Sequence, residues 1–199
     1  MLQITNTSKA FNNHFLKVSK SKGLFILKRP NDEAEFDTVG GSVNRIETRI
    51  HKTKDGKEFI LWHLLLNDEK IGDSYDISFP ENSGLFVIIM RCLASEEGLQ
   101  GLDDIQIQIK KSDDGNFLNA TVRNNGKSIG WLPGAVPPIM YTKEGKGYKA
   151  DFSKRQEWLH NLAGIVNWAI ESGEIISYSD CEEEYNENEM EGSEDEYEL

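Results

Sequence analysis

Basic and aromatic side chains recur through the middle of the chain at spacings that suit contacts with phosphates and with flat rings. Five bases gather between positions 45 and 57, and a second group runs from 110 to 131. Lysine and arginine neutralise phosphates, and exposed aromatic rings stack on nucleobases. The residues selected for this chemistry are Arg45, Arg49, Lys52, Lys54, Lys57, Trp62, Lys110, Lys111, Phe117, Arg123, Lys127 and Trp131.

The aromatic candidates differ in strength. Phe117 is the best one, because it falls on the polar side of an alternating segment, where core packing does not explain a phenylalanine. Trp62 and Trp131 adjoin apolar residues, so each belongs either to a stacking site or to the core. Phe59 and Tyr75 are expected in the core. Single surface lysines are usually just solvated, so it is their clustering that favours a binding site.

Catalytic and metal-binding motifs are missing from the sequence. The four histidines have no metal-ligand spacing, and no CxxC, HExxH, GxSxG or Walker motif occurs. The paired acids Asp103-Asp104 and Asp113-Asp114 fit turns and caps better than a metal site. The chain is therefore predicted not to be an enzyme and to use no cofactor or metal.

The acidity of the chain is confined to one end. The sequence holds 34 acidic and 22 basic residues, and eleven of the acids lie in 180–199, which has no Lys or Arg. The remaining 179 residues are close to neutral, so the net charge of -12 does not argue against a polyanionic ligand. A segment of this composition cannot bury enough apolar surface to fold, and the tail is predicted to be disordered.

Alternating patterns predict the elements that must position these side chains. Turn signals separate them at Asp55-Gly56, Asp114-Gly115 and Asn125-Gly126. A continuous apolar stretch is assigned to a helix on length, and the last helix carries one apolar stripe. The predicted strands are 23–30, 42–51, 58–66, 71–79, 104–110, 116–123 and 127–131, and the predicted helices are 85–94 and 153–172.

The order strand, strand, strand, helix, strand, strand between 41 and 124 is that of an oligonucleotide-binding (OB) fold. The predicted class is mainly β: a five-stranded OB-type Greek-key barrel with a helix between strands 3 and 4, plus a C-terminal helix. The predicted division is 1–39 as a basic N-terminal arm and strand, 40–132 as the barrel, 133–179 as a Pro-containing loop and C-terminal helix, and 180–199 as the tail.

In this organisation the chain resembles the single-stranded DNA-binding proteins of bacteriophages and bacteria, and the phage type most. The resemblance covers the barrel, about 41–131, and the tail, and the pair Trp62-His63 is similar to a Trp-His pair of the bacterial proteins, whose Trp stacks on DNA. It implies sequence-nonspecific single-stranded DNA binding in replication and recombination. It also implies that the tail competes for the DNA groove and recruits replication proteins, such as a polymerase or primase-helicase, through Tyr197, Glu198 and Leu199. The family usually ends in Phe, and this chain ends in Leu199.

Other interpretations stay open. One alternative is a protein-interaction module or an acidic regulator that mimics DNA and does not bind single-stranded DNA. Another is an RNA binder that uses the same barrel. The stripe of helix 153–172 packs on the barrel or forms a homodimer. Two cysteines, no signal-like N-terminus and no apolar run of bilayer length predict a cytoplasmic protein without a membrane partner, in the host cytoplasm if viral.

Overall fold

The computed structural model describes residues 11–28, 33–144 and 147–174. The predicted acidic tail, with Tyr197, Glu198 and Leu199, lies outside the described residues. The strands are Asn12–Ser19 (β1), Leu24–Lys28 (β2), Glu33–Phe36 (β3), Thr38–Lys52 (β4), Glu58–Asp68 (β5), Asp73–Pro80 (β6), Ile105–Lys111 (β7), Leu118–Asn124 (β8), Lys127–Ser128 (β9), Met140–Glu144 (β10) and Gly147–Asp151 (β11). The helices are Gly84–Leu93 (α1), Glu96–Leu99 (α2) and Ser153–Ser172 (α3), with a short 3-10 turn at Leu102–Asp104.

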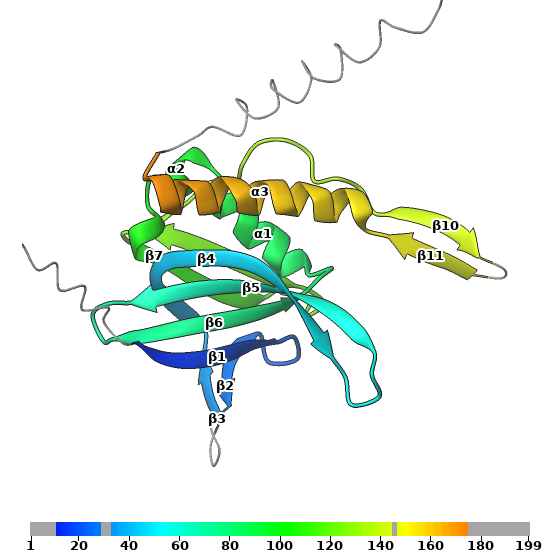
Figure 1. Cartoon of the computed structure of the whole chain (residues 1–199), viewed down its shortest axis with the longest axis horizontal. Coiled ribbons are helices and arrows are strands. Elements are labelled where there is room, and N and C mark those ends of the chain that lie inside the picture. The colour runs from blue at the N-terminus through cyan, green and yellow to red at the C-terminus, as the bar shows by residue number, and fades with distance from the viewer. Residues whose placement is uncertain (1–10, 29–32, 145–146, 175–199) are drawn as a thin grey trace, which may run out of the picture.

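The strands form one large mixed sheet and a separate hairpin (Figure 1). The large sheet has nine strands in the order β3-β2-β1-β6-β5-β4-β7-β8-β9, and β10 pairs only with β11. β1 runs parallel to β6, while every other neighbouring pair in that order is antiparallel. The protein is therefore mainly β with a C-terminal helix, as the sequence predicted.

The large sheet is not closed, and in this respect the predicted barrel is wrong. A barrel closes when its outermost strands pair with each other. Here β6 pairs on its second edge with β1, through a register that places Leu16 opposite Ile77, and the second edge of β8 pairs with β9. The sheet still curls, because β2 packs against both β4 and β7.

The N-terminal segment belongs to the sheet. Leu16 of β1 and Phe25 and Leu27 of β2 are buried in the same core as the later strands. The predicted boundary between residues 39 and 40 falls inside β4. The described part of the segment 1–39 therefore completes the sheet instead of acting as a separate arm.

β4 is long because it serves two partners. Its first residues pair with β7, and from Ser42 onward it pairs with β5. The change of partner falls at Gly40-Gly41, where the backbone approaches β5 closely. A Cβ on Gly41 would lie 2.5 Å from the carbonyl oxygen of Asn67, and Gly41 has φ of 150°. Only glycine fits this crossing without displacing backbone.

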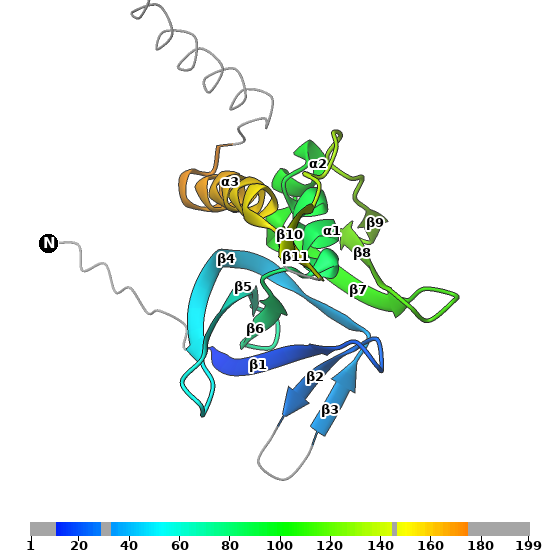
Figure 2. The same ribbon diagram turned by 90° about the vertical axis from the view of Figure 1, so that its right-hand side faces the viewer.

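The helices cover one face of the sheet (Figures 1 and 2). α1 begins at the cap Ser83, whose hydroxyl accepts from the N–H of Phe86, and it is buried along most of its length. α3 packs its stripe, including Leu159, Leu162 and Val166, against β4 and α1. Within the residues that the structure describes, no helix has the length and apolarity needed to cross a membrane.

Candidate nucleic-acid interface

The face of the sheet turned away from the helices carries polar side chains from four adjacent strands, and we call it the open face. The pairing registers place Lys17, Ser78, His63 and Glu47 in one row across β1, β6, β5 and β4. The side chains in this phase are Asn13, Phe15, Lys17, Arg45, Glu47, Arg49, His51, Phe59, Leu61, His63, Leu65, Ser74, Asp76 and Ser78.

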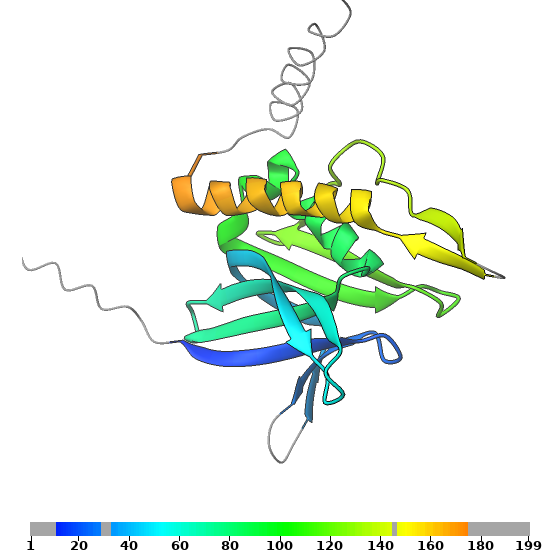
Figure 3. The same ribbon diagram turned by 45° about the vertical axis from the view of Figure 1, so that its right-hand side comes forward.

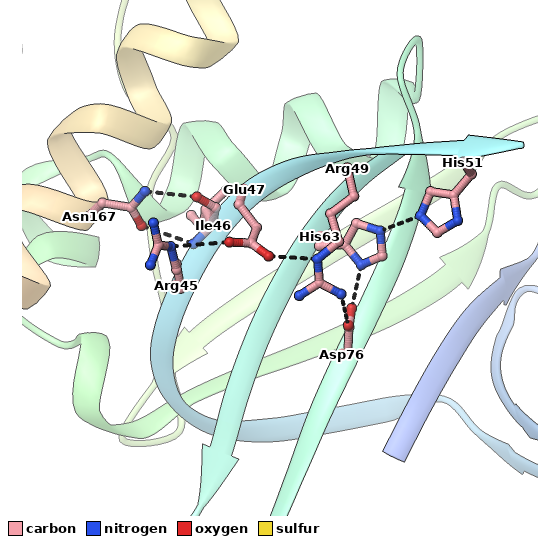
Figure 4. A network of polar contacts seen from close by, with 8 residues as sticks. All are labelled: Arg45, Ile46, Glu47, Arg49, His51, His63, Asp76 and Asn167. Carbon is pink, nitrogen blue, oxygen red and sulfur yellow. Dashed lines mark hydrogen bonds and ion pairs between the residues drawn. The ribbon is translucent and has the colours of Figure 1, made fainter. Parts of the chain in front are cut away.

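Ion pairs tie the two arginines of the open face to carboxylates (Figure 4). Glu47 lies 3.2 Å from the Nε of Arg45 and 2.6 Å from the Nε of Arg49. The Nη1 of Arg49 also donates to Asp76 on β6, at 2.6 Å. The guanidinium of Arg49 is thus fixed on two sides, and its position on the face is set by its neighbours.

The carboxylate of Asp76 also contacts His63, which in turn contacts His51. The Nδ1 of His63 lies 2.5 Å from Oδ1 of Asp76, and its Nε2 lies 3.0 Å from Nε2 of His51. His63 is buried, while His51 is partly exposed. This chain of contacts therefore leads from the interior of the face to its surface at the end of β4.

In this network the charged form of Asp76 and that of Arg49 stabilise each other. Burial raises the pKa of Asp76, but hydrogen bonds and charge from His63 and Arg49 outweigh burial and hold that pKa below its ordinary value. Burial likewise opposes the charge of Arg49, yet its contacts with Glu47 and Asp76 raise the pKa of the guanidinium. Asp76 and Arg49 are therefore both charged at neutral pH.

Two phenylalanine rings stand exposed on the open face. The side chain of Phe15 is 66% exposed and that of Phe59 is 42% exposed. A hollow of about 570 Å³ beside Phe15 is lined by both Arg49 and Leu65. Core packing does not explain two exposed phenylalanines on the polar side of a sheet. Their rings offer flat surfaces to a ligand.

Three hairpin turns border this part of the sheet, with the β4–β5 turn on one side and the β1–β2 and β7–β8 turns together on the other (Figures 2 and 3). They are the β4–β5 turn with Lys54 and Lys57, the β1–β2 turn, and the β7–β8 turn. The last two are in contact, because a Cβ on Gly23 would lie 2.9 Å from Cγ of Lys111. The lysines of the turns therefore flank the open face.

The structure brings only part of the predicted set together. Arg45 and Arg49 lie on the open face, but both are ion-paired, and Lys52 pairs with Glu58 at 2.7 Å. Lys54 and Lys57 are exposed on the β4–β5 turn. Residues Lys110, Lys111 and the exposed Phe117 lie at the base of the β7–β8 turn.

Trp62 was a stacking candidate, and that prediction is wrong. Its side chain is 1% exposed and points to the helix side of the sheet. The ring stacks on Phe86 and lies against His160, and its Nε1 donates to Gln156 of α3 at 3.1 Å. A ring enclosed on both sides cannot receive a nucleobase, so Trp62 is a core residue.

The remaining predicted residues lie elsewhere. Trp131 is 60% exposed, but it packs under the guanidinium of Arg91 of α1, 5.2 Å from the ring centroid. Arg123 donates to Gln108, and Lys127 is exposed on β9. These side chains lie on β8 and beyond, separated from the open face by β7, so they do not join its network.

Protein-family models, curated proteins and solved structures were all compared with the chain, and none of them matches it. Function is therefore inferred from the geometry alone.

Among the described residues, no group of three or more His, Cys, Asp or Glu side chains is arranged to hold a metal ion.

Sequence reasoning missed most members of the open face, among them Phe15, Lys17, Glu47, His51, Phe59, His63 and Asp76. Phe59 was expected in the core, yet it lies near the free end of the β4–β5 hairpin and is exposed. A buried-strand pattern interrupted by a histidine was the available signal for His63, because such a group needs a polar partner. Phe15 had no clear signal, since its segment was not assigned to a strand.

Proposed function

We propose that the protein binds single-stranded DNA across the open face, with no catalytic activity. The observation that carries this proposal is the exposure of Phe15 and Phe59 on the same polar face as Arg49. Single-strand binders combine aromatic platforms with cations along the strand path. The proposed path runs from the β4–β5 turn, over these rings, to the β1–β2 and β7–β8 turns.

We also propose that β4, β5, β6, α1, β7 and β8 form an OB-type unit in which β1 occupies the edge where closure would occur. OB-folds bind oligonucleotides on the face of their second and third strands, between the loops joining strands 1–2 and 4–5. In this assignment those strands are β5 and β6 and those loops are the β4–β5 and β7–β8 turns. Both loops carry exposed lysines, Lys54 and Lys57 on the first and Lys110 and Lys111 at the start of the second, which supports the proposal.

Phosphate contacts are assigned to the lysines of the turns. The paired arginines set the surface on which the strand lies, whereas Lys17, Lys20, Lys54, Lys57, Lys110 and Lys111 are the proposed contacts. If each of these six lysines neutralises one phosphate, the logarithm of affinity should fall with the logarithm of salt at a slope of about −4.

We propose that residues 180–199 compete with DNA for the lysines of the turns and recruit replication proteins, in the cytoplasm. A polyanion tethered near its binding site acts at high effective concentration, so few contacts suffice.

A protein-interaction role is the second candidate. A hollow of about 800 Å³ between the β4–β5 hairpin and the β10–β11 hairpin is lined by Ile60 and Pro80, by the carboxylates Glu81, Glu144 and Asp151, and by Lys149, which pairs with Glu144 at 3.6 Å. An apolar hollow with acidic walls suits a cationic peptide better than DNA. This role predicts no retention of single-stranded DNA.

Fluorescence anisotropy with labelled oligo-dT tests the main proposal. We expect the full chain to prefer oligo-dT over duplex DNA and to lose affinity steeply with salt. Phe15→Ala and Phe59→Ala should each weaken binding by about 5- to 150-fold, which corresponds to stacking energies of roughly 1–3 kcal/mol. The matched control is Phe36→Ala on β3, outside the open face, which should bind like the wild type.

Two results would count against this function. Failure of the full chain to bind oligo-dT even at 50 mM salt would remove it. Equal losses in all three phenylalanine variants would show that the open face is not the binding surface. A parallel series with oligo-rU separates a DNA preference from an RNA preference.

A further inference from the structure

The chain Asp76–His63–His51 on the open face has a defined order of hydrogen bonds. The carboxylate of Asp76 is ionised and accepts only, so the Nδ1 of His63 carries a hydrogen and donates to it. When His63 is neutral, its Nε2 is therefore an acceptor, and the Nε2 of His51 donates to it. In this state the Nδ1 of His51 has no hydrogen and can only accept.

One added proton reverses this order. Bound at the Nδ1 of His51, it lets the hydrogen between the two Nε2 atoms transfer to His63. His63 then donates through both nitrogens, and His51 presents an N–H at Nδ1. The pair holds one extra proton and not two, because a second would set two N–H groups against each other across 3.0 Å. The two nitrogens of an imidazole point in nearly opposite directions, so the Nδ1 of His51 points away from His63 (Figure 4).

The added proton changes the net charge of the groups around the histidine pair. Arg45 and Arg49 from β4 are balanced by Glu47 of β4 and Asp76 of β6. With both histidines neutral, these four groups sum to zero, and the added proton brings the cluster to +1. Lys17 of β1 lies in the same row as His63 but two strands away, with Ser78 of β6 between them.

An aromatic surface stands next to the exposed end of this chain. The ring of Phe59 stacks on that of His51, with centroids 5.7 Å apart and planes inclined by 25°. A base on Phe59 would bring its own phosphate near His51.

We propose that His51 and His63 form a proton-linked phosphate site, in which a phosphate of the bound strand docks at His51 and one proton enters the pair with it. This inference rests on the proposed function of the open face and adds a regulation to it. Binding a phosphate favours the protonated pair, and by linkage protonation favours binding. Imidazole changes its charge between pH 5 and 8, so the effect should fall in that range.

The test measures affinity of the full chain for oligo-dT by anisotropy from pH 5.5 to 8.0 at constant ionic strength. We expect affinity to rise by about three- to tenfold per pH unit as the pH falls, since one proton is linked to binding. Calorimetry in two buffers of different ionisation enthalpy should show up to one proton taken up per bound oligonucleotide.

His51→Gln should abolish this proton uptake and flatten the pH profile. His51 is partly exposed and is not part of the core, so we expect His51→Gln to fold. It therefore tests the proposal even if the variant at the buried residue, His63→Gln, does not fold. The control is His160→Gln on α3, on the other face of the sheet, which should keep the full pH dependence.

The outcomes separate this inference from the function on which it rests. Oligo-dT binding that depends on Phe15 and Phe59 but has the same pH profile in wild type and His51→Gln overturns the proton-linked site alone. No binding at any pH overturns both. Titration with inorganic phosphate distinguishes the source of the ligand: equal proton uptake with phosphate alone would show a site for the free anion and overturn the assignment to a strand.

Discussion

The side chain of Asn167 and the backbone of Ile46 form a pair of hydrogen bonds across 121 positions of sequence. The Oδ1 of Asn167 accepts from the N–H of Ile46 at 2.9 Å, and its Nδ2 donates to the carbonyl of Ile46 at 2.8 Å. Ile46 lies where β4 has parted from β7, just after a register shift between Val43 and Arg45. Asn167 therefore supplies the partner that the strand edge has lost, and it joins α3 to the sheet.

Asn167→Leu should destabilise the protein by about 2–4 kcal/mol, because it leaves a backbone N–H and a carbonyl without partners in a partly buried position. Urea unfolding followed by circular dichroism measures this. Asn161→Leu, on the exposed side of the same helix, is the control and should change stability by less than about 0.5 kcal/mol. Equal effects in the two variants would show that the pair contributes nothing.

Trp62→Ala should cost about 3–5 kcal/mol of stability, since it removes a large core ring and leaves a cavity between α1 and α3. Trp62→Phe, which keeps most of the ring, should cost less and should bind oligo-dT like the wild type. Thermal unfolding and anisotropy together separate stability from binding. Trp168→Ala, at a ring that is 47% exposed, serves as the comparison. Loss of affinity in Trp62→Phe without loss of stability would restore Trp62 to the binding surface.

Asp76 should make the protein acid-labile. Its pKa is lower in the folded protein than in the unfolded chain. Its contribution is therefore fully present above the unfolded value, near pH 4, and is lost as the pH falls through the folded value. Asp76→Asn should lower stability at pH 7 by roughly 1–3 kcal/mol and should lower it less at pH 2.5. Urea midpoints from pH 2.5 to 7 measure this. Asp113→Asn, in an exposed turn, should follow the wild type at each pH; a uniform loss in Asp76→Asn would contradict the linkage.

The thiol of Cys92 should be inert in the folded protein. Burial raises its pKa to about 11, with the charge of Arg91 acting weakly in the opposite direction. At neutral pH this leaves ~100-fold less thiolate than the ordinary value of 9.0 allows, and the thiolate is the reactive form. Iodoacetamide labelling, followed at the Cys92 peptide by mass spectrometry, should be at least that much slower in native buffer than in 6 M urea. Similar rates in both would show that the α1 region opens readily.

Removing the tail should strengthen DNA binding. A chain ending at residue 179 loses eleven acidic residues. We expect its affinity for oligo-dT to rise at low salt and the gain to shrink toward 0.5 M salt, since screening weakens the tail and the DNA alike. A tail with the same composition but scrambled order is the control for sequence-specific contacts. An unchanged affinity at 50 mM salt would remove the competition from the proposal.

Alternation along the chain was sufficient to predict β4, β7 and β8, and β7 buries alternate residues, Ile105, Ile107 and Ile109. β5 was predicted from a run that is apolar on both faces. β1 was missed because its eight residues include only Leu16 as a buried side chain. Its place is decided by the unpaired edge of β6, which no local pattern reports. The open sheet follows from that one strand.

The candidate site was only partly predictable for a related reason. His51 and His63 are 12 positions apart, and His63 and Asp76 are 13 apart, so only the registers of β4, β5 and β6 bring them together. Trp62 was ambiguous because its strand is apolar on both faces. Packing by Phe86 and His160, from two distant helices, decides its position.

The two ends of the large sheet discourage further strands from adding to it. One end is β3, whose Glu33 and Glu35 both bind Lys22, and the other is β9, only two residues long. Charged and very short edge strands are poor templates for aggregation. Copies of the chain held at high local concentration should therefore stay separate, without their large sheets fusing into fibrils.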